Sequence, residues 1–137
     1  MARDLLLDTS ALVSLLDRAQ ERHSECAEFF HDWTGSVVTT EAVLTEATHL
    51  LSHVSGGRAA CLRFVLGGGA MLVPTDTPAL RRCERLIAQF ADLPMDYADA
   101  TLVVLADELD SDMVFTLDRD FDVYRRRDGR PLRRVPQ

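Results

Sequence analysis

The chain has 137 residues, which suits one domain spanning 1–137 around one core. It is 47% hydrophobic and 27% charged, as in ordinary globular proteins, and its net charge of −7 disfavours a generally nucleic-acid-binding surface. The longest apolar run near the N-terminus covers only 5–7, too short for a signal peptide core or a membrane span. We therefore expect a cytoplasmic protein.

Short apolar runs alternate with segments whose apolar residues recur three and four positions apart. The first pattern predicts strands and the second predicts helices. In chain order we expect a strand over 5–7, a helix carrying 12–16, a helix over 22–33, a strand over 36–39, a helix from 41 to about 53, a helix over 58–66, a strand over 71–73, a helix over 77–90, a helix over 96–109, a strand over 113–117 and an edge strand over 132–135.

Several of these helices begin with residues that favour a helix start. Thr9 or Ser10 can cap the first helix, Thr40 the helix after the second strand, and Thr77, followed by Pro78, the helix over 77–90. Strands that alternate with helices predict an α/β sandwich with a mostly parallel sheet.

Four acidic residues, Asp8, Glu46, Asp99 and Asp118, stand in or at the end of apolar segments. Burying a lone carboxylate is costly unless its charge is paired, protonated or bound to a metal. We therefore expect folding to gather these four acids around a cation. Carboxylate oxygens are hard ligands that suit Mg²⁺ or Mn²⁺.

The predicted elements give each acid a place. Asp8 and Asp118 directly follow strands, and ligands of open α/β sheets bind beyond the carboxyl ends of the strands. Glu46 lies beside the buried stripe of its helix. Asp99 lies near the N-terminal end of the most apolar helix, with Asp96 three residues before it, and the helix dipole lowers the cost of negative charge there.

Each acid also has a purely structural interpretation. Asp8 can cap the first helix, Asp118 can belong to a tight turn, and Asp96, which begins its helix, is more typical of a cap than of a ligand. Glu46 is the exception, because its apolar helix neighbours offer no obvious partner.

Every one of the fifteen basic residues is an arginine, and nine of these arginines gather in two regions. Such clusters suit phosphate or carboxylate partners, although a solvated, salt-bridged face gives the same pattern. The two groups are Arg81, Arg82 and Arg85, and Arg125, Arg126, Arg127, Arg130, Arg133 and Arg134.

Four segments together resemble a PIN-domain ribonuclease, and in particular a VapC-like toxin of a type II toxin–antitoxin system. No single segment is highly specific, but their order and spacing over nearly the whole chain are. The segments are LLLDTSALVSLL at 5–16, TTEAVLTEATHLL at 39–51, MDYADATLVVLADEL at 95–109 and FTLDRDF at 115–121.

This resemblance implies a three-layer α/β/α sandwich around a short, mostly parallel sheet. It implies RNA cleavage that depends on Mg²⁺ or Mn²⁺, and a homodimer that a small antitoxin inhibits. The residues that match the family's site are the acids Asp8, Glu46, Asp99 and Asp118, the hydroxyl position Thr116, and, as weaker matches, Ser10 and Asp96.

The acid quartet motivates a mechanistic hypothesis. Asp8, Asp99 and Asp118 would hold the principal ion. Glu46 would bind a second ion, directly or through water, or help to deprotonate the attacking water. Thr116 would bind a carboxylate or a metal-bound water. The arginines that would hold flanking phosphates are Arg119, Arg125 and Arg126.

Three other functions would use some of the same residues. A haloacid-dehalogenase-like phosphatase also places an Asp after the first strand, but it needs a second acid where this chain has Ser10 and a lysine that the chain lacks. A PIN-like RNA-processing nuclease that is not a toxin would carry the same acids. A non-catalytic module could hold them in a cation-stabilised or arginine-paired cluster, with Arg3 or Arg119 as internal partners.

Overall fold

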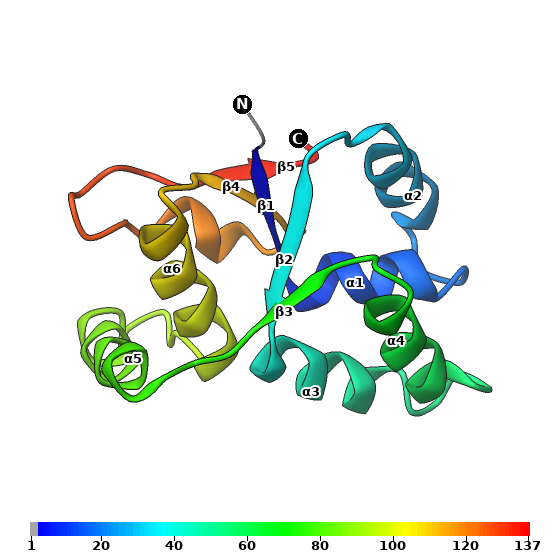
Figure 1. Cartoon of the computed structure of the whole chain (residues 1–137), viewed down its shortest axis with the longest axis horizontal. Helices are drawn as coiled ribbons and strands as arrows, with labels where there is room; N and C mark the ends of the chain where they lie inside the picture. Colours follow the sequence, from blue (N-terminus) through cyan, green and yellow to red (C-terminus); the bar gives the residue numbers. More distant parts are fainter. Residues whose placement is uncertain (1–2) are drawn as a thin grey trace.

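The computed structural model describes residues 3–137, which form a five-stranded sheet with helices on both faces (Figure 1). Within this range no helix is both long and apolar enough to cross a membrane. The elements are β1 (Asp4–Leu7), α1 (Thr9–Leu16), α2 (His23–Asp32), β2 (Ser36–Thr40), α3 (Glu41–Leu50), α4 (Gly57–Leu66), β3 (Met71–Val73), α5 (Thr77–Gln89), α6 (Tyr97–Leu109), β4 (Met113–Phe115), the short 3-10 helix η1 (Arg119–Asp122) and β5 (Arg133–Val135).

The sheet has the order β3-β2-β1-β4-β5, and all four of its strand pairings are parallel. β1 is central, and its Leu6 lies between Val38 of β2 and Val114 of β4. The last predicted strand is confirmed as an edge strand. All carboxyl ends of the strands therefore meet at one edge of the sheet.

Side chains on β1 alternate between two hydrophobic cores. Leu6 packs into a core with residues of α5 and α6, whereas Leu5 and Leu7 pack into a core with residues of α1, α2 and α4. α3 contacts helices on both sides. Because both faces of the sheet are covered, its strands read as short continuous apolar runs. The predicted three-layer α/β/α class is confirmed.

Some predicted ends were wrong. β4 ends at Phe115 rather than at 117, because the next residues turn away: the Leu117 N–H donates to Ser10 Oγ and the Asp118 N–H donates to Thr116 Oγ1. α3 ends at Leu50 rather than near 53, and turns follow it.

Two of the predicted helix caps were also wrong. The cap of α5 is Asp76, whose carboxylate accepts from the Ala79 N–H, and Thr77 is the first helical residue. The residue at the cap position of α1 is Asp8, not Thr9 or Ser10. Thr40 is confirmed as the cap of α3, where its hydroxyl accepts from the Val43 N–H.

Candidate active site

Three of the predicted acids meet at the carboxyl edge of the sheet. Carboxylate oxygens of Asp8, Asp99 and Asp118 all lie within 4.8 Å of one another. Asp8 is 3% exposed and Asp99 is 6% exposed, while Asp118 is partly buried. Asp8 follows β1, Asp118 follows β4, and Asp99 lies in the first turn of α6. We call these three residues the acidic cluster.

The pairing of β1 with β4 explains the position of Asp8. Leu7 is paired with Phe115, and the Asp8 N–H donates to the Phe115 carbonyl, 3.0 Å away. The next residue of β4's chain, Thr116, therefore lies beside Asp8, and its hydroxyl donates to Asp8 Oδ2 at 2.6 Å. The Asp8 side chain makes no capping hydrogen bond to α1, so its carboxylate serves the cluster instead.

Ser10 and Thr116 act as a pair of hydroxyls beneath the cluster. Their oxygens lie 3.2 Å apart, and Ser10 Oγ is 3.4 Å from Asp8 Oδ2. Each hydroxyl also accepts a backbone N–H from the segment after β4. These contacts hold the loop that carries Asp118 against the loop that carries Asp8.

Asp99 is held from two directions. Asp96 caps α6, with its Oδ1 accepting from the Asp99 N–H at 2.8 Å, and Tyr124 donates its hydroxyl to Asp99 Oδ2, also at 2.8 Å. The Tyr124 ring is fully buried and packs edge-on against Phe90 and Phe121. Reasoning from the sequence missed Tyr124. The only available signal was that a buried tyrosine needs a partner for its hydroxyl.

Asp118 combines two roles. One of its oxygens, Oδ1, accepts from the Asp120 N–H at 2.9 Å and so caps η1. The structural interpretation of Asp118 as a turn residue is therefore right, but the same carboxylate also belongs to the acidic cluster. The capping bond fixes the carboxylate in place beside Asp8.

Glu46 lies close to the cluster without joining it. Its side chain on α3 is partly buried, and it is not among the carboxylates that meet within 4.8 Å. Burial raises the pKa of Glu46, and the negative charges of Asp96 and Asp118 raise it further. The buried hydroxyl of Thr9 lies beside this carboxylate and makes no hydrogen bond to any residue in 3–137. The Thr9 hydroxyl beside Glu46 is therefore a buried polar group without a hydrogen-bond partner in residues 3–137.

The cluster carries more negative charge than its surroundings balance. Burial raises the pKa of Asp8 to about 7, against the opposing hydrogen bond from Thr116. Burial also raises the pKa of Asp99 to about 8, helped by the negative charge of Asp8 and opposed by the Tyr124 hydroxyl. Three oxygen donors at such short range, with no ion pair to any arginine of residues 3–137, fit a hard divalent cation.

The three predicted phosphate-binding arginines have different environments. Arg119 is exposed on η1, next to Asp118, and its guanidinium makes no hydrogen bond within 3–137. Arg125 donates to backbone carbonyls of residues 122, 123 and 124. Arg126 is buried and bound to Asp107 and Asp110, so its guanidinium is already paired; its contact with a flanking phosphate stays a prediction.

The arginine-paired alternative loses its support here. Arg3 lies over the ring of Trp33, 5.0 Å from its centroid, and no ion pair joins any arginine of the described chain to the acidic cluster. Protonation or a cation from solution is therefore left to neutralise these acids.

Comparison with known proteins agrees with this geometry. The sequence pattern of the PIN domain matches residues 5–127. The chain belongs to the PIN domain family. The ribonuclease VapC26 of Mycobacterium tuberculosis is 30% identical over 117 residues, which cover 84% of this chain and 87% of VapC26. The resemblance to VapC-like PIN-domain proteins drawn from the sequence is thus confirmed.

Solved structures share the PIN fold with this chain. VapC20 of Mycobacterium tuberculosis, a sarcin–ricin loop cleaving toxin, superposes with a TM-score of 0.80 at 18% identity, covering 87% of this chain and 93% of VapC20. VapBC2 from Rickettsia felis, bound to a promoter DNA fragment, gives 0.68 at 12% identity, covering 97% and 99%. DNA-bound VapBC from Salmonella typhimurium gives 0.60 at 17%, covering 98% of each chain.

Proposed function

We propose that this PIN domain is a divalent-metal-dependent endoribonuclease and the toxin of a toxin–antitoxin pair. The observation that carries the proposal is the convergence of Asp8, Asp99 and Asp118 within 4.8 Å at the carboxyl edge of the sheet, where no arginine of residues 3–137 forms an ion pair with them. The similarity to the ribonuclease VapC26 over most of both chains supports RNA as the substrate. An RNA substrate inside the cell also agrees with the expected cytoplasmic location.

The donor set favours Mg²⁺ or Mn²⁺ as the ion. All three ligands are carboxylates, and no cysteine or histidine belongs to the group that meets within 4.8 Å. Zinc sites in proteins usually include sulfur or imidazole ligands, whereas carboxylate sites suit Mg²⁺ and Mn²⁺. A bound ion would supply positive charge for the phosphate and activate a water for attack.

The chain's own residues would hold the cation in place and deprotonate the attacking water. Asp8, Asp99 and Asp118 would bind the cation, while Thr116 and Tyr124 keep the first two carboxylates in their orientations. Glu46, on α3 and close to the cluster, would accept a proton from the attacking water, since burial and nearby acids raise its pKa. The water would attack the phosphodiester in line, and the 3′ oxygen would leave.

We also propose two protein partners. As the resemblance to VapC-like toxins implies, a small antitoxin would bind this chain and block the acidic cluster. The homodimer expected from the resemblance remains a proposal.

Cleavage assays test the proposed function directly. The purified chain is incubated with structured and single-stranded RNAs in Mn²⁺, Mg²⁺ or EDTA, next to an Asp99→Asn variant. We expect cleavage only with a metal and only with Asp99 present. Full activity in a folded Asp99→Asn protein would contradict the proposed mechanism. Metal binding without cleavage of any RNA would favour the non-catalytic module. Growth arrest on expression of the unmodified chain, but not of Asp99→Asn, separates a toxin from an RNA-processing nuclease.

A further inference from the structure

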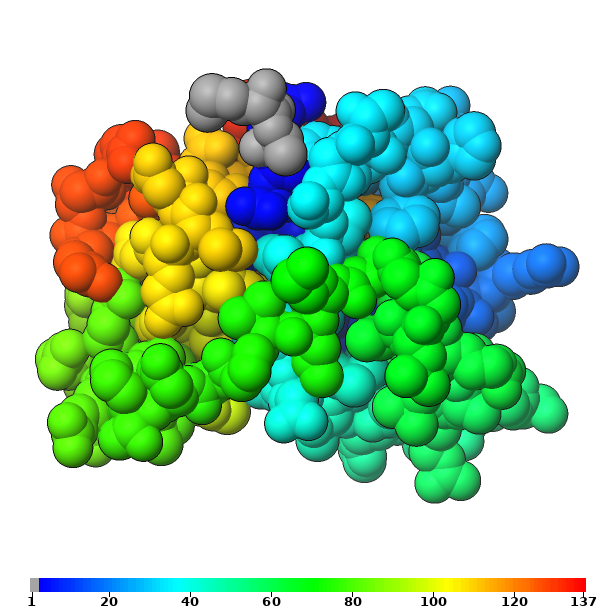
Figure 2. Space-filling model, in the orientation of Figure 1, coloured from blue at the N-terminus to red at the C-terminus, as the bar shows by residue number. Residues whose placement is uncertain are grey.

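A second polar surface lies on the α5–α6 side of the sheet, away from the carboxyl edge. A cavity of about 600 Å³ opens between α5, the end of α6 and the loop that precedes β5. In Figure 2 this loop, in orange, and α5, in green, flank α6, in yellow. Its lining residues include five arginines and one acid, and we call it the arginine groove. They are Arg82, Arg85, Arg125, Arg126, Arg127 and Asp107.

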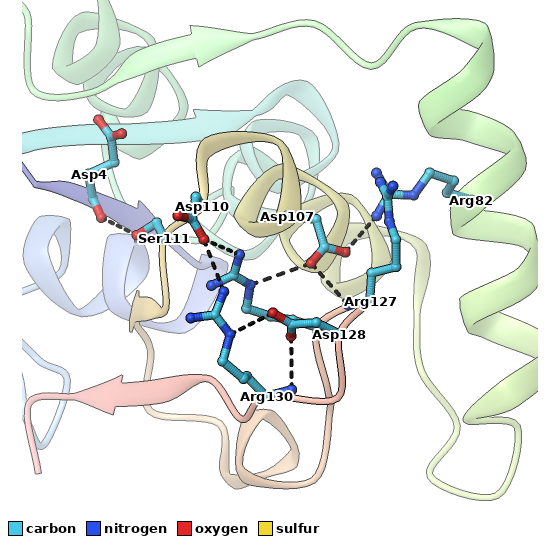
Figure 3. Close-up of polar contacts among 9 residues, drawn as sticks. Asp4, Arg82, Asp107, Asp110, Ser111, Arg127, Asp128 and Arg130 are labelled. Atoms are coloured by element: carbon cyan, nitrogen blue, oxygen red, sulfur yellow. Dashed lines mark hydrogen bonds and ion pairs between the residues drawn. The ribbon is translucent and has the colours of Figure 1, made fainter.

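Asp107 organises the floor of the groove. Its carboxylate accepts from Arg82 through one oxygen, and from Arg126 Nε at 3.4 Å and the Arg127 N–H at 3.0 Å through the other (Figure 3). The side chains of Asp107 and Arg126 are only 8% and 6% exposed. The loop is therefore held in one conformation by buried charge pairs, and this places its remaining arginines.

Two arginines of the groove are left without internal partners. Among residues 3–137, the guanidinium groups of Arg85 and Arg127 make neither a hydrogen bond nor an ion pair, and both side chains are exposed. Figure 3 shows the Arg127 side chain extending toward Arg82, a residue of like charge. Positive charges held close together without a counter-charge favour binding of an anion.

α6 links the groove to the acidic cluster. The helix carries Asp99 in its first turn and the groove residue Asp107 eight residues later, about 12 Å along its axis. A strand of RNA with its scissile phosphate at the cluster would therefore reach the groove with phosphates further along the strand. This positive surface contrasts with the net charge of −7 of the whole chain.

We propose that the arginine groove binds the phosphate backbone of the RNA that is cut at the acidic cluster, with Arg85 and Arg127 as the contacting residues. This inference rests on the proposed function. Phosphate is favoured over an acidic polypeptide because the lining offers only one aliphatic side chain, Leu86, whereas peptide-binding grooves usually provide apolar anchor pockets. Arg126 contributes by fixing the loop rather than by touching phosphate.

Binding measured separately from cleavage tests this proposal. An Asp99→Asn background prevents cleavage, and fluorescence anisotropy follows a labelled single-stranded RNA through a NaCl series. Adding Arg85→Gln and Arg127→Gln should weaken binding by about tenfold and reduce the slope of log K against log salt by about 1.4, from two lost phosphate contacts. The matched control is Arg63→Gln, an exposed arginine of α4 on the other side of the sheet; it should change neither quantity.

The following results would contradict RNA binding in the arginine groove. Unchanged affinity and slope in the double variant, or an equal loss in Arg63→Gln, would exclude these contacts. Loss of poly-glutamate binding with RNA binding unchanged would assign the groove to an acidic polypeptide. The proposed function is tested separately, by measuring whether the chain with its acidic cluster intact cleaves a dinucleotide. That substrate is too short to reach the groove, so the double variant should cut it at the unmodified rate.

Discussion

The acidic cluster and the arginine groove lie near opposite ends of α6 and bury charge in opposite ways. At the first turn of the helix, Asp99 meets two further carboxylates, and the donors to this cluster are uncharged hydroxyls and one backbone N–H. Near the last turn, Asp107 meets the guanidinium groups of Arg82 and Arg126. The groove's buried charge is balanced within the chain, so it needs no ligand to be stable. The cluster's charge is not balanced, so the cluster needs a cation.

This contrast separates stability from function. Removing an acid from the cluster relieves repulsion between like charges, and so should abolish activity without unfolding the protein. Removing Asp107 from the groove leaves Arg82 without its ion-pair partner and the buried Arg126 with only the exposed Asp110, and so should make the protein easier to unfold.

The largest expected effect is on catalysis. Asp8→Asn keeps the size of the side chain but removes one of three metal-binding charges, and RNA cleavage should fall by about 1,000-fold or more. Thermal melting in EDTA should show a midpoint equal to or above that of the unmodified chain. Asp4→Asn, at the other end of the same strand, is the matched control and should cleave normally. A lower melting midpoint for Asp8→Asn would mean that the carboxylate stabilises the fold.

The next effect is on stability. Asp107→Ala leaves Arg126 buried with only its exposed partner Asp110, and should lower the free energy of unfolding in urea by about 3 kcal/mol. Asp128→Ala removes an acid whose partner, Arg130, is 60% exposed, so its loss should be clearly smaller. Equal losses for the two variants would show that burial of the pair is unimportant.

A smaller effect is expected from the tyrosine that holds Asp99. Tyr124→Phe keeps the ring packing but removes the hydroxyl, and should lower cleavage by about 10- to 100-fold, as loss of an orienting partner of a metal ligand typically does. The apparent affinity for Mn²⁺ should fall in parallel. Tyr97→Phe, a half-exposed tyrosine at the start of α6, should leave both unchanged. Normal Mn²⁺ affinity in Tyr124→Phe would contradict the positioning role.

The smallest effect is a dependence of stability on pH in the absence of metal. The folded pKa values of Asp8 and Asp99, about 7 and about 8, exceed the ordinary value of 3.8, so the folded state binds more protons than the unfolded state between these values. In EDTA, the free energy of unfolding should therefore decrease as the pH rises from about 5 to 8. Mg²⁺ should reduce this decrease, and so should Asp8→Asn. Stability that rises over this range in EDTA would contradict the assigned pKa shifts.

The sequence predicted the positions of those site residues that follow strands. Asp8 and Asp118 follow parallel neighbouring strands, so their meeting could be predicted from the order of the elements. Asp99 could be predicted because it begins an apolar helix that packs beside this edge. Glu46 was harder to place, because a side chain on the next helix can lie at several distances from the strand ends.

Tertiary packing decided what the sequence could not. Arg125, Arg126 and Arg127 are adjacent and chemically identical, yet they cap carbonyls, form buried ion pairs and face solvent, respectively. No periodicity marks which of the three points inward, since the loop belongs to neither helix nor sheet. Tyr124 was missed for the same reason, because its hydroxyl reaches Asp99 only once its ring is packed between Phe90 and Phe121.

Calorimetric titration of the purified chain with Mn²⁺ at pH 7.5 measures whether the acidic cluster is a metal site. The acidic cluster predicts saturable binding that releases protons, because Asp8 and Asp99 are partly protonated before the ion binds. It also predicts that binding is lost in Asp99→Asn and kept in Asp107→Asn. No binding at millimolar Mn²⁺, or equal binding by the Asp99→Asn variant, would show that these three acids do not form a metal site.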